Sequence, residues 1–121
     1  MKPKELVAIA RSLATDQNRS LGSTRHLAAA LLLRQALEDA IDDYWQTALS
    51  AMEPLSARAQ LITLPFYIDP ALAARVQFTW YQLSATCHHD AYDLPPPLHE
   101  LESAAETVMQ LVDSSATSTS S

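Results

Sequence analysis

The sequence predicts an all-α protein, and three observations support this prediction. The chain of 121 residues contains one glycine and no run of alternating β-branched residues, so strands are disfavoured. Alanine and leucine, which favour helices, dominate the segments between prolines and polar clusters. Apolar residues recur at the spacing of helices with one buried face. We therefore expect an antiparallel helical bundle of four long helices plus one short helix over residues 1–113, followed by a disordered Ser/Thr-rich tail over residues 114–121.

The first two helices are expected over residues 3–15 and from residue 23 or 24 to about residue 51. Pro3 is tolerated in the first turn of a helix, and Ser23 or Thr24 can cap the second one. The first helix should bury Leu6, Ile9, Ala10 and Leu13. The inward stripe predicted for the second helix is Leu27, Ala30, Leu31, Arg34, Leu37, Ile41, Trp45 and Ala48. We expect this second helix to be the central element or to meet a second subunit.

Three further helices are expected after Pro54, which disfavours helical geometry at the residue before it. Ser56 should cap a short helix that Pro65 stops, and the following "FYI" should form a buried connector. Asp69 and Pro70 suit the N-cap and first position of a helix that reaches residue 89. Its predicted apolar stripe is Leu72, Val76, Trp80, Leu83 and Cys87. The last helix follows "PPP" and should bury Leu98, Leu101, Ala105, Val108 and Val112.

Charge and cysteine content exclude several classes of protein. The formal net charge is -6, and five of the eight basic residues fall within the first 25 positions. From residue 26 onward, three arginines stand against twelve acidic residues. DNA is therefore not an expected partner, because phosphate-backbone binding needs a clustered basic surface, and at most a small basic patch near the N-terminus stays open. There is no apolar run of about 18 residues, so no membrane span is expected. The single cysteine, Cys87, excludes an intramolecular disulfide and suits a reducing compartment. We expect a cytoplasmic protein without a cofactor.

The stretch "ATCHHDAYDLPPP", residues 85–97, gathers several side chains that could carry chemistry. On a regular helix His88 and His89 diverge by about 100°, whereas two histidines that chelate one ion need i, i+4 spacing. We favour a helix end whose histidines complement the dipole and bond free carbonyls, so no metal is predicted. Two alternatives stay open. One histidine could serve recognition or catalysis, or a frayed helix could bring Cys87, His88, His89 and Asp90 around a metal or small ligand.

Arg34 and Glu38 stand at i, i+4 spacing within an otherwise apolar stripe. A guanidinium there must be paired or must border a cavity, because an unpaired buried charge is costly. The pair either fixes helix register or lines a cleft that holds a phosphate or carboxylate. The adjacent "EDAIDD" lacks the Glu-x-x-His partners of a di-iron site, so we interpret it as a solvated acidic face. Trp80 and Tyr81 complete the candidate binding residues.

The patterns "LAAALLLRQALEDAIDDYW" and "WYQLSATCHHDAYDLPP", with a closing amphipathic helix, resemble small helical proteins of actinobacterial type. Some of these are similar to the HEPN superfamily, so the resemblance implies a HEPN-like bundle that dimerises. Active HEPN proteins are metal-independent ribonucleases of toxin–antitoxin and antiphage systems, with a motif of Arg, four to six residues, then His. Arg19 and His26 match this spacing, but they stand at the entry to an earlier helix than the family's motif usually opens.

The favoured function is a small dimerising or partner-docking interaction and regulatory module. Its support is the long apolar second helix, the aromatic residues Trp45, Trp80 and Tyr81, and the lack of a complete catalytic set. The expected partner is a second copy or another protein.

The alternative is a HEPN-like ribonuclease, for which RNA is the substrate. His26, His88 or His89 would then act as general base, since histidine suits proton transfer near neutral pH. Arg19 or Arg34 would stabilise the developing negative charge on the phosphate. Whether the protein is an enzyme stays open at this point.

Overall fold

The computed structural model describes residues 1–15, 24–48, 56–87 and 96–119, and the elements found there are all helices. In chain order they are α1 (Pro3–Thr15), α2 (Thr24–Ala48), α3 (Ala57–Thr63), the 3-10 helix η2 (Leu64–Phe66), α4 (Pro70–Cys87) and α5 (Leu98–Thr119). The described ranges contain no strand, so the predicted all-α class is confirmed. None of these helices combines the length and the apolar character that a bilayer span needs.

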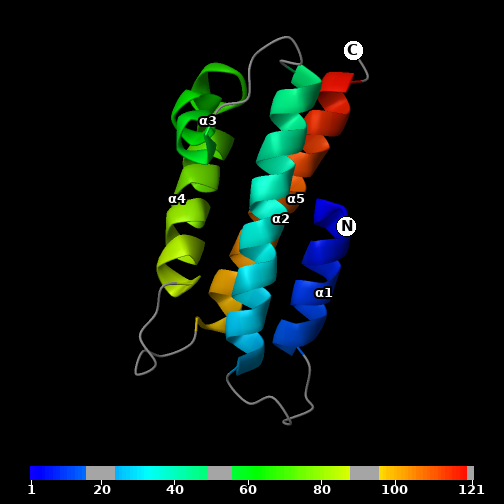
Figure 1. Ribbon diagram of the computed structural model, residues 1–121, viewed down its shortest axis with the longest axis vertical. Helices are drawn as coiled ribbons and strands as arrows, with labels where there is room; N and C mark the ends of the chain where they lie inside the picture. Colours follow the sequence, from blue (N-terminus) through cyan, green and yellow to red (C-terminus); the bar gives the residue numbers. More distant parts are fainter. Residues whose placement is uncertain (16–23, 49–55, 88–95, 120–121) are drawn as a thin grey trace.

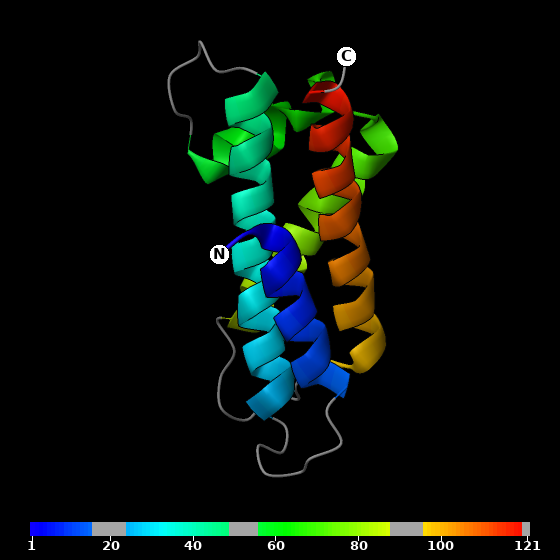
Figure 2. The same ribbon diagram turned by 90° about the vertical axis from the view of Figure 1, so that its right-hand side faces the viewer.

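The two longest helices, α2 and α5, form the centre of the molecule. They lie side by side and run in the same direction, as the colour gradient in Figure 1 shows. Helix α1 packs on one side of this pair, and α4 packs on the other side (Figures 1 and 2). Both flanking helices run opposite to α2 and α5. Helix α3 and η2 lie over the beginning of α4, at the end of the molecule where α2 and α5 finish.

Aliphatic side chains from every long helix meet in one core. The largest fully buried ones are Leu33, Leu37 and Ile41 of α2, Leu64 of η2, Val7, Val76, Val108 and Leu111. Burial of one such side chain contributes about 1.5–3 kcal/mol. Alanines fill the remaining inward positions of the central pair, namely Ala29, Ala30, Ala36, Ala40, Ala104 and Ala105. Because these residues are small, the helices can approach closely while the leucines fill the space between them.

The buried faces of α1 and α2 differ from the predicted stripes. Leu27 and Leu31 are exposed at 36% and 56%, whereas Ala29, Ala36 and Ala40 are buried. In α1, Ile9 is exposed at 40%, and Val7 and Ala14 are buried in addition to Leu6 and Ala10. The predicted stripe of α2 followed its leucines, but α1, α4 and α5 all pack on α2. The alanine-rich face accommodates close neighbours better than a leucine ridge does.

Two of the predicted helix starts are confirmed by their capping hydrogen bonds. Ser56 Oγ accepts a hydrogen bond from the Ala59 backbone N–H at 3.2 Å. Asp69 Oδ2 accepts one from the Leu72 N–H at 3.3 Å. Each bond satisfies a backbone donor that has no partner within its own helix.

The predicted buried connector after Pro65 is wrong, because Phe66 is exposed at 82% and Tyr67 at 48%. The chain forms η2 there instead, and Leu64 is the residue that enters the core. In a 3-10 helix, residues two positions apart lie on different sides, so burying Leu64 turns Phe66 outward.

The stripes predicted for α4 and α5 are only partly buried. Leu72, Val76 and Leu83 lie in the core while Trp80 is half-buried, and the burial of Cys87 lies outside the description. In α5, Leu101, Ala105 and Val108 are buried, Val112 is half-buried and Leu98 is 42% exposed. Leu98 stands in the first turn of α5, where the helix reaches the edge of the core. Residues 114–119, predicted as a disordered tail, lie in the last turns of α5.

Hydrogen bonds fix α3 and η2 to the longer helices. Gln77 Nε2 of α4 donates to the Leu61 carbonyl at 2.7 Å, and Gln60 Nε2 of α3 donates to Asp42 Oδ1 of α2 at 3.2 Å. The Tyr44 hydroxyl donates to the Tyr67 carbonyl at 3.1 Å. These bonds join residues far apart in sequence, so the α3, η2 and α4 segment has a defined position on α2.

Candidate functional site

Arg34 and Glu38 form the ion pair that their spacing predicts. Arg34 Nε lies 3.3 Å from Glu38 Oε1, and the two side chains are 29% and 35% exposed. The guanidinium carbon also lies 5.9 Å from the centroid of the Trp80 ring. A helical pair of this exposure contributes only about 0.3–0.5 kcal/mol, and the cation–π contact about 0.5–1 kcal/mol. Arg34 therefore connects α2 to α4 without being sealed in the core.

Trp80 connects Arg34 to the molecular surface through its neighbour Tyr81. Its ring meets the Tyr81 ring edge-to-face, with the centroids 5.4 Å apart and the planes at 85°. Tyr81 is 57% exposed. Trp80 Nε1 is buried and has no hydrogen-bond partner among the described residues. The structure thus brings the four candidate binding residues into one strip, in the order Glu38, Arg34, Trp80 and Tyr81.

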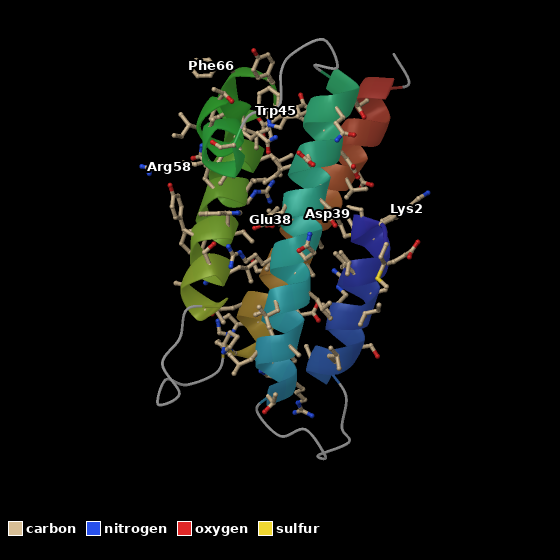
Figure 3. The ribbon with its side chains drawn as sticks, viewed as in Figure 1. Lys2, Glu38, Asp39, Trp45, Arg58 and Phe66 are labelled. Carbon is tan, nitrogen blue, oxygen red and sulfur yellow. The ribbon has the colours of Figure 1, made fainter. Side chains whose placement is uncertain are left out.

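The acidic cluster of α2 does not form a shared site in the part of the chain described. Glu38 pairs with Arg34, and Asp39 Oδ1 accepts a hydrogen bond from Gln35 Nε2 at 2.9 Å. Asp42 accepts the bond from Gln60 described above. Figure 3 shows Glu38 and Asp39 leaving α2 at neighbouring positions near the middle of the helix. Because each of these carboxylates has a different partner, they form separate surface contacts and not one metal centre.

His26 is the catalytic candidate that the structure places most clearly. It lies in the first turn of α2, is half-buried, and its Nδ1 is 2.8 Å from the Pro96 carbonyl oxygen. A carbonyl oxygen only accepts, so Nδ1 is the donor in this contact, and Nε2 is an acceptor when the ring is neutral. This bond ties the start of α2 to the segment that precedes α5.

Three other catalytic candidates, Arg19, His88 and His89, lie outside the described residues, as does Asp90. The spacing motif of Arg19 and His26 and the cluster after Cys87 therefore stay predictions. Within the described ranges, no three His, Cys, Asp or Glu side chains are grouped so that they could hold a metal ion.

A hollow between α1 and α5 offers little to a small ligand. Its volume is about 690 Å³, and it is lined by Arg11, Leu98, His99, Glu102, Ser103 and Glu106. Arg11 Nε lies 3.7 Å from Glu102 Oε2, and both side chains are 44% exposed. Small-molecule sites are usually enclosed cavities. This hollow is open to solvent and therefore lacks that character.

The outward face of α4 was not predicted from the sequence. Its exposed apolar side chains follow each other at intervals of three and four residues, the spacing of one helical face: Ala71, Ala74, Phe78, Tyr81 and Ala85. Phe78 is 66% exposed. Arg75 is the one charged residue of the helix. The signal was present in the sequence, because a helix with apolar residues on both faces cannot bury both against one side of a bundle.

Further large apolar side chains are exposed beside the beginning of α4. Ile62 of α3 is 57% exposed and Phe66 of η2 is 82% exposed. Phe66 and Arg58 project away from the central pair of helices in Figure 3. We call the exposed side chains of this segment the α3–α4 surface, defined by Arg58, Ile62, Phe66, Tyr67, Arg75 and the outward face of α4.

The α3–α4 surface also differs in charge from the two central helices. Residues 56–87 contain two arginines, Arg58 and Arg75, against one acidic residue, Asp69. Residues 24–48 contain two arginines against four acidic residues, and residues 96–119 contain four acidic residues and no lysine or arginine. The apolar face is therefore flanked by positive charge in a protein of net charge -6.

Comparisons of the chain with protein-family models, with curated proteins and with solved structures gave no match. The residues themselves must then indicate the chemistry. The described part of the chain offers aromatic rings and guanidinium groups at the surface, which are suited to binding, and one oriented imidazole at His26.

Proposed function

We propose that this protein is a helical interaction module that docks another polypeptide on the α3–α4 surface. The observation that carries the proposal is the outward face of α4, where Phe78 and Tyr81 are more than half exposed between alanines. Removing apolar surface from water gains about 25 cal/mol per Å². An aromatic face of this kind, together with Phe66, is typical of a surface that a partner covers.

The composition of the α3–α4 surface supports the same function. Aromatic residues and arginine are enriched in protein interfaces, while acidic residues are depleted. The surface contains Phe66, Phe78 and Tyr81 beside Arg58 and Arg75. Hydrogen bonds from Tyr44, Gln60 and Gln77 hold its supporting segment in place, so docking requires little ordering of the backbone.

We also propose a HEPN-like bundle and a cytoplasmic location for this protein. Four longer helices and the short α3 would form an antiparallel bundle of HEPN-like type, and the opposite directions of consecutive long helices support the antiparallel arrangement. A cytoplasmic location is supported by the single cysteine, Cys87. The proposal includes the dimerising and regulatory role expected of such a module.

Site-specific photo-crosslinking in cells tests the proposed function. A photoreactive phenylalanine analogue replaces Phe78 in one strain and Leu31 in another, since Leu31 is an exposed apolar residue of α2 at 56%. We expect a discrete crosslinked product from position 78, several-fold more abundant than any product from position 31. Equal yields from both positions, or none from position 78, would reject docking on the α3–α4 surface.

A HEPN-like ribonuclease of a toxin–antitoxin or antiphage system is the second candidate. It is supported by the hydrogen bond from His26 to the Pro96 carbonyl, which leaves Nε2 as a proton acceptor. A general base needs this tautomer and a fixed ring orientation. Arg34 is paired with Glu38 and does not share a described contact with His26, so no complete catalytic set has been assembled.

Expression of the wild-type chain beside the His26→Ala and Arg34→Ala variants separates the two functions. The interaction module predicts normal growth and intact total RNA in all three strains. RNA breakdown that requires His26 and persists without added metal would establish the ribonuclease instead. A His26→Gln variant, which can still donate to the Pro96 carbonyl, controls for loss of that structural bond.

A further inference from the structure

We propose that the partner of the α4 face is the same face of a second copy of this chain, packed antiparallel about a two-fold axis. This inference rests on the proposed interaction function and names its occupant. Three observations support it: the order of side chain sizes along the face, the area that is exposed, and the distribution of charge over the molecule.

Four of the five side chains on the outward face of α4 read the same in both directions. Ala74, Phe78, Tyr81 and Ala85 give the order small, aromatic, aromatic, small, and the centre of this pattern lies between residues 79 and 80. A two-fold axis through that centre brings Phe78 against Tyr81 of the second copy, twice, and Ala74 level with Ala85 of the second copy. A closed homodimer needs such a self-complementary patch, because each contact occurs in duplicate.

The central contact of this arrangement has favourable chemistry. Two Phe–Tyr pairs across the axis can adopt the edge-to-face or offset geometry that aromatic rings prefer, worth about 0.5–1.5 kcal/mol per pair beyond area burial. The flanking alanines add no bulk that would hold the two helices apart. Arg75 is the one charged residue of the helix. At about 1.5 Å per residue, Arg75 of one copy lies about 13 Å along the helix axis from Arg75 of the other. The two positive charges therefore do not face each other.

The exposed area is enough for a reversible dimer. A fully exposed aromatic side chain presents about 150–250 Å², so the exposed parts of Phe78 and Tyr81 present roughly 250 Å² per copy. Ile62 and Phe66, beside the beginning of α4, raise this figure to at most roughly 500 Å² per copy. Two copies then bury at most about 1,000 Å², which is below the range of stable complexes and within that of weak, transient ones. We therefore expect a dissociation constant in the micromolar range.

The charge distribution favours this face over the other faces for self-association. Two copies of net charge -6 repel each other in general. The acidic residues of the described chain are concentrated on α2 and α5, whereas residues 56–87 carry an excess of one positive charge. Packing α4 on α4 keeps the acidic helices of the two copies apart. On α4 itself, an acidic partner protein could form an ion pair with only one residue, Arg75.

Sedimentation equilibrium of the full chain, from about 1 µM to about 500 µM, tests the dimer. The wild type should change from a monomer of 13.3 kDa to a dimer with rising concentration. Tyr81→Asp and Phe78→Asp should each weaken the dimer at least tenfold. Leu31→Asp is the matched control, since Leu31 and Tyr81 are 56% and 57% exposed. Far-UV circular dichroism verifies that all variants keep their helices.

Three results would overturn the dimer. The wild type could stay monomeric at every concentration, the variants of α4 could dimerise like the wild type, or species larger than a dimer could form, as head-to-tail contacts between α4 and an acidic helix would produce. Loss of the dimer in Leu31→Asp alone would place the interface on α2. A monomeric chain that still gives a crosslink from position 78 would reject the second copy as partner and retain the proposed docking function.

Discussion

At the scale of single residues, the polar groups near α4 mostly position helices, and the aromatic groups face outward. Arg34 touches both Glu38 and Trp80, so one side chain joins α2 to α4. The apolar stripe around Arg34 predicted a guanidinium that is either paired or borders a cavity, and the structure contains the pair with Glu38. The stripe gave no means to predict that Trp80 would be the second contact, because that contact depends on how two helices pack.

Tyr44 provides a residue-scale prediction about pH. Burial and the nearby Tyr67 raise the pKa of Tyr44 above its ordinary value of 10.0. The folded state therefore favours the neutral phenol, and this stabilisation is complete below pH 10.0 and is lost as the pH rises through the folded-state pKa. Urea unfolding from pH 8 to pH 11 should show this loss in the wild type, and Tyr44→Phe should lose stability less steeply.

The same variant also measures the hydrogen bond from Tyr44 to the Tyr67 carbonyl. At pH 8 we expect Tyr44→Phe to be about 1 kcal/mol less stable than the wild type, because the carbonyl loses its donor. If the free energy of unfolding changed identically with pH in the two proteins above pH 10, Tyr44 would have no part in the loss of stability at high pH.

At the scale of elements, helix ends could be predicted better than helix faces. Pro3, Ser56 and Asp69 marked the starts of α1, α3 and α4 because capping and proline geometry act within a few residues. Faces depend on neighbours that a single helix does not reveal. Leu31 was therefore expected inside, and Phe66 was expected in a buried connector, yet both are exposed.

The N-cap of α4 gives a prediction at this scale. Asp69→Ala removes the acceptor for the Leu72 N–H and should lower the free energy of unfolding by about 1 kcal/mol. Asp69→Asn should retain most of the stability, since its side chain oxygen can still accept the bond. Chemical denaturation of the three proteins provides the comparison. Equal losses in both variants would mean that the carboxylate charge, rather than the cap, stabilises α4.

At the scale of the whole molecule, the position of α4 explains why a binding surface arises there. Helices α2 and α5 are covered by α1 on one side and by α4 on the other, so α4 has one face in the core and one face outside (Figure 2). A helix in that position usually has a polar outer face, but the outer face of α4 carries Phe78, Tyr81 and alanines. The candidate residues Trp80 and Tyr81 were chosen from the sequence as aromatics. That these two residues form one strip with Arg34 and Glu38 could be recognised only from the tertiary structure.

Photo-crosslinking from position 78, measured against position 31, tests the central claim most directly, because it asks whether the outward face of α4 is covered in the cell. We predict a discrete product from position 78 that exceeds any product from position 31 several-fold. Comparable yields from the two positions would contradict it, since both side chains are exposed but only one lies on the α3–α4 surface.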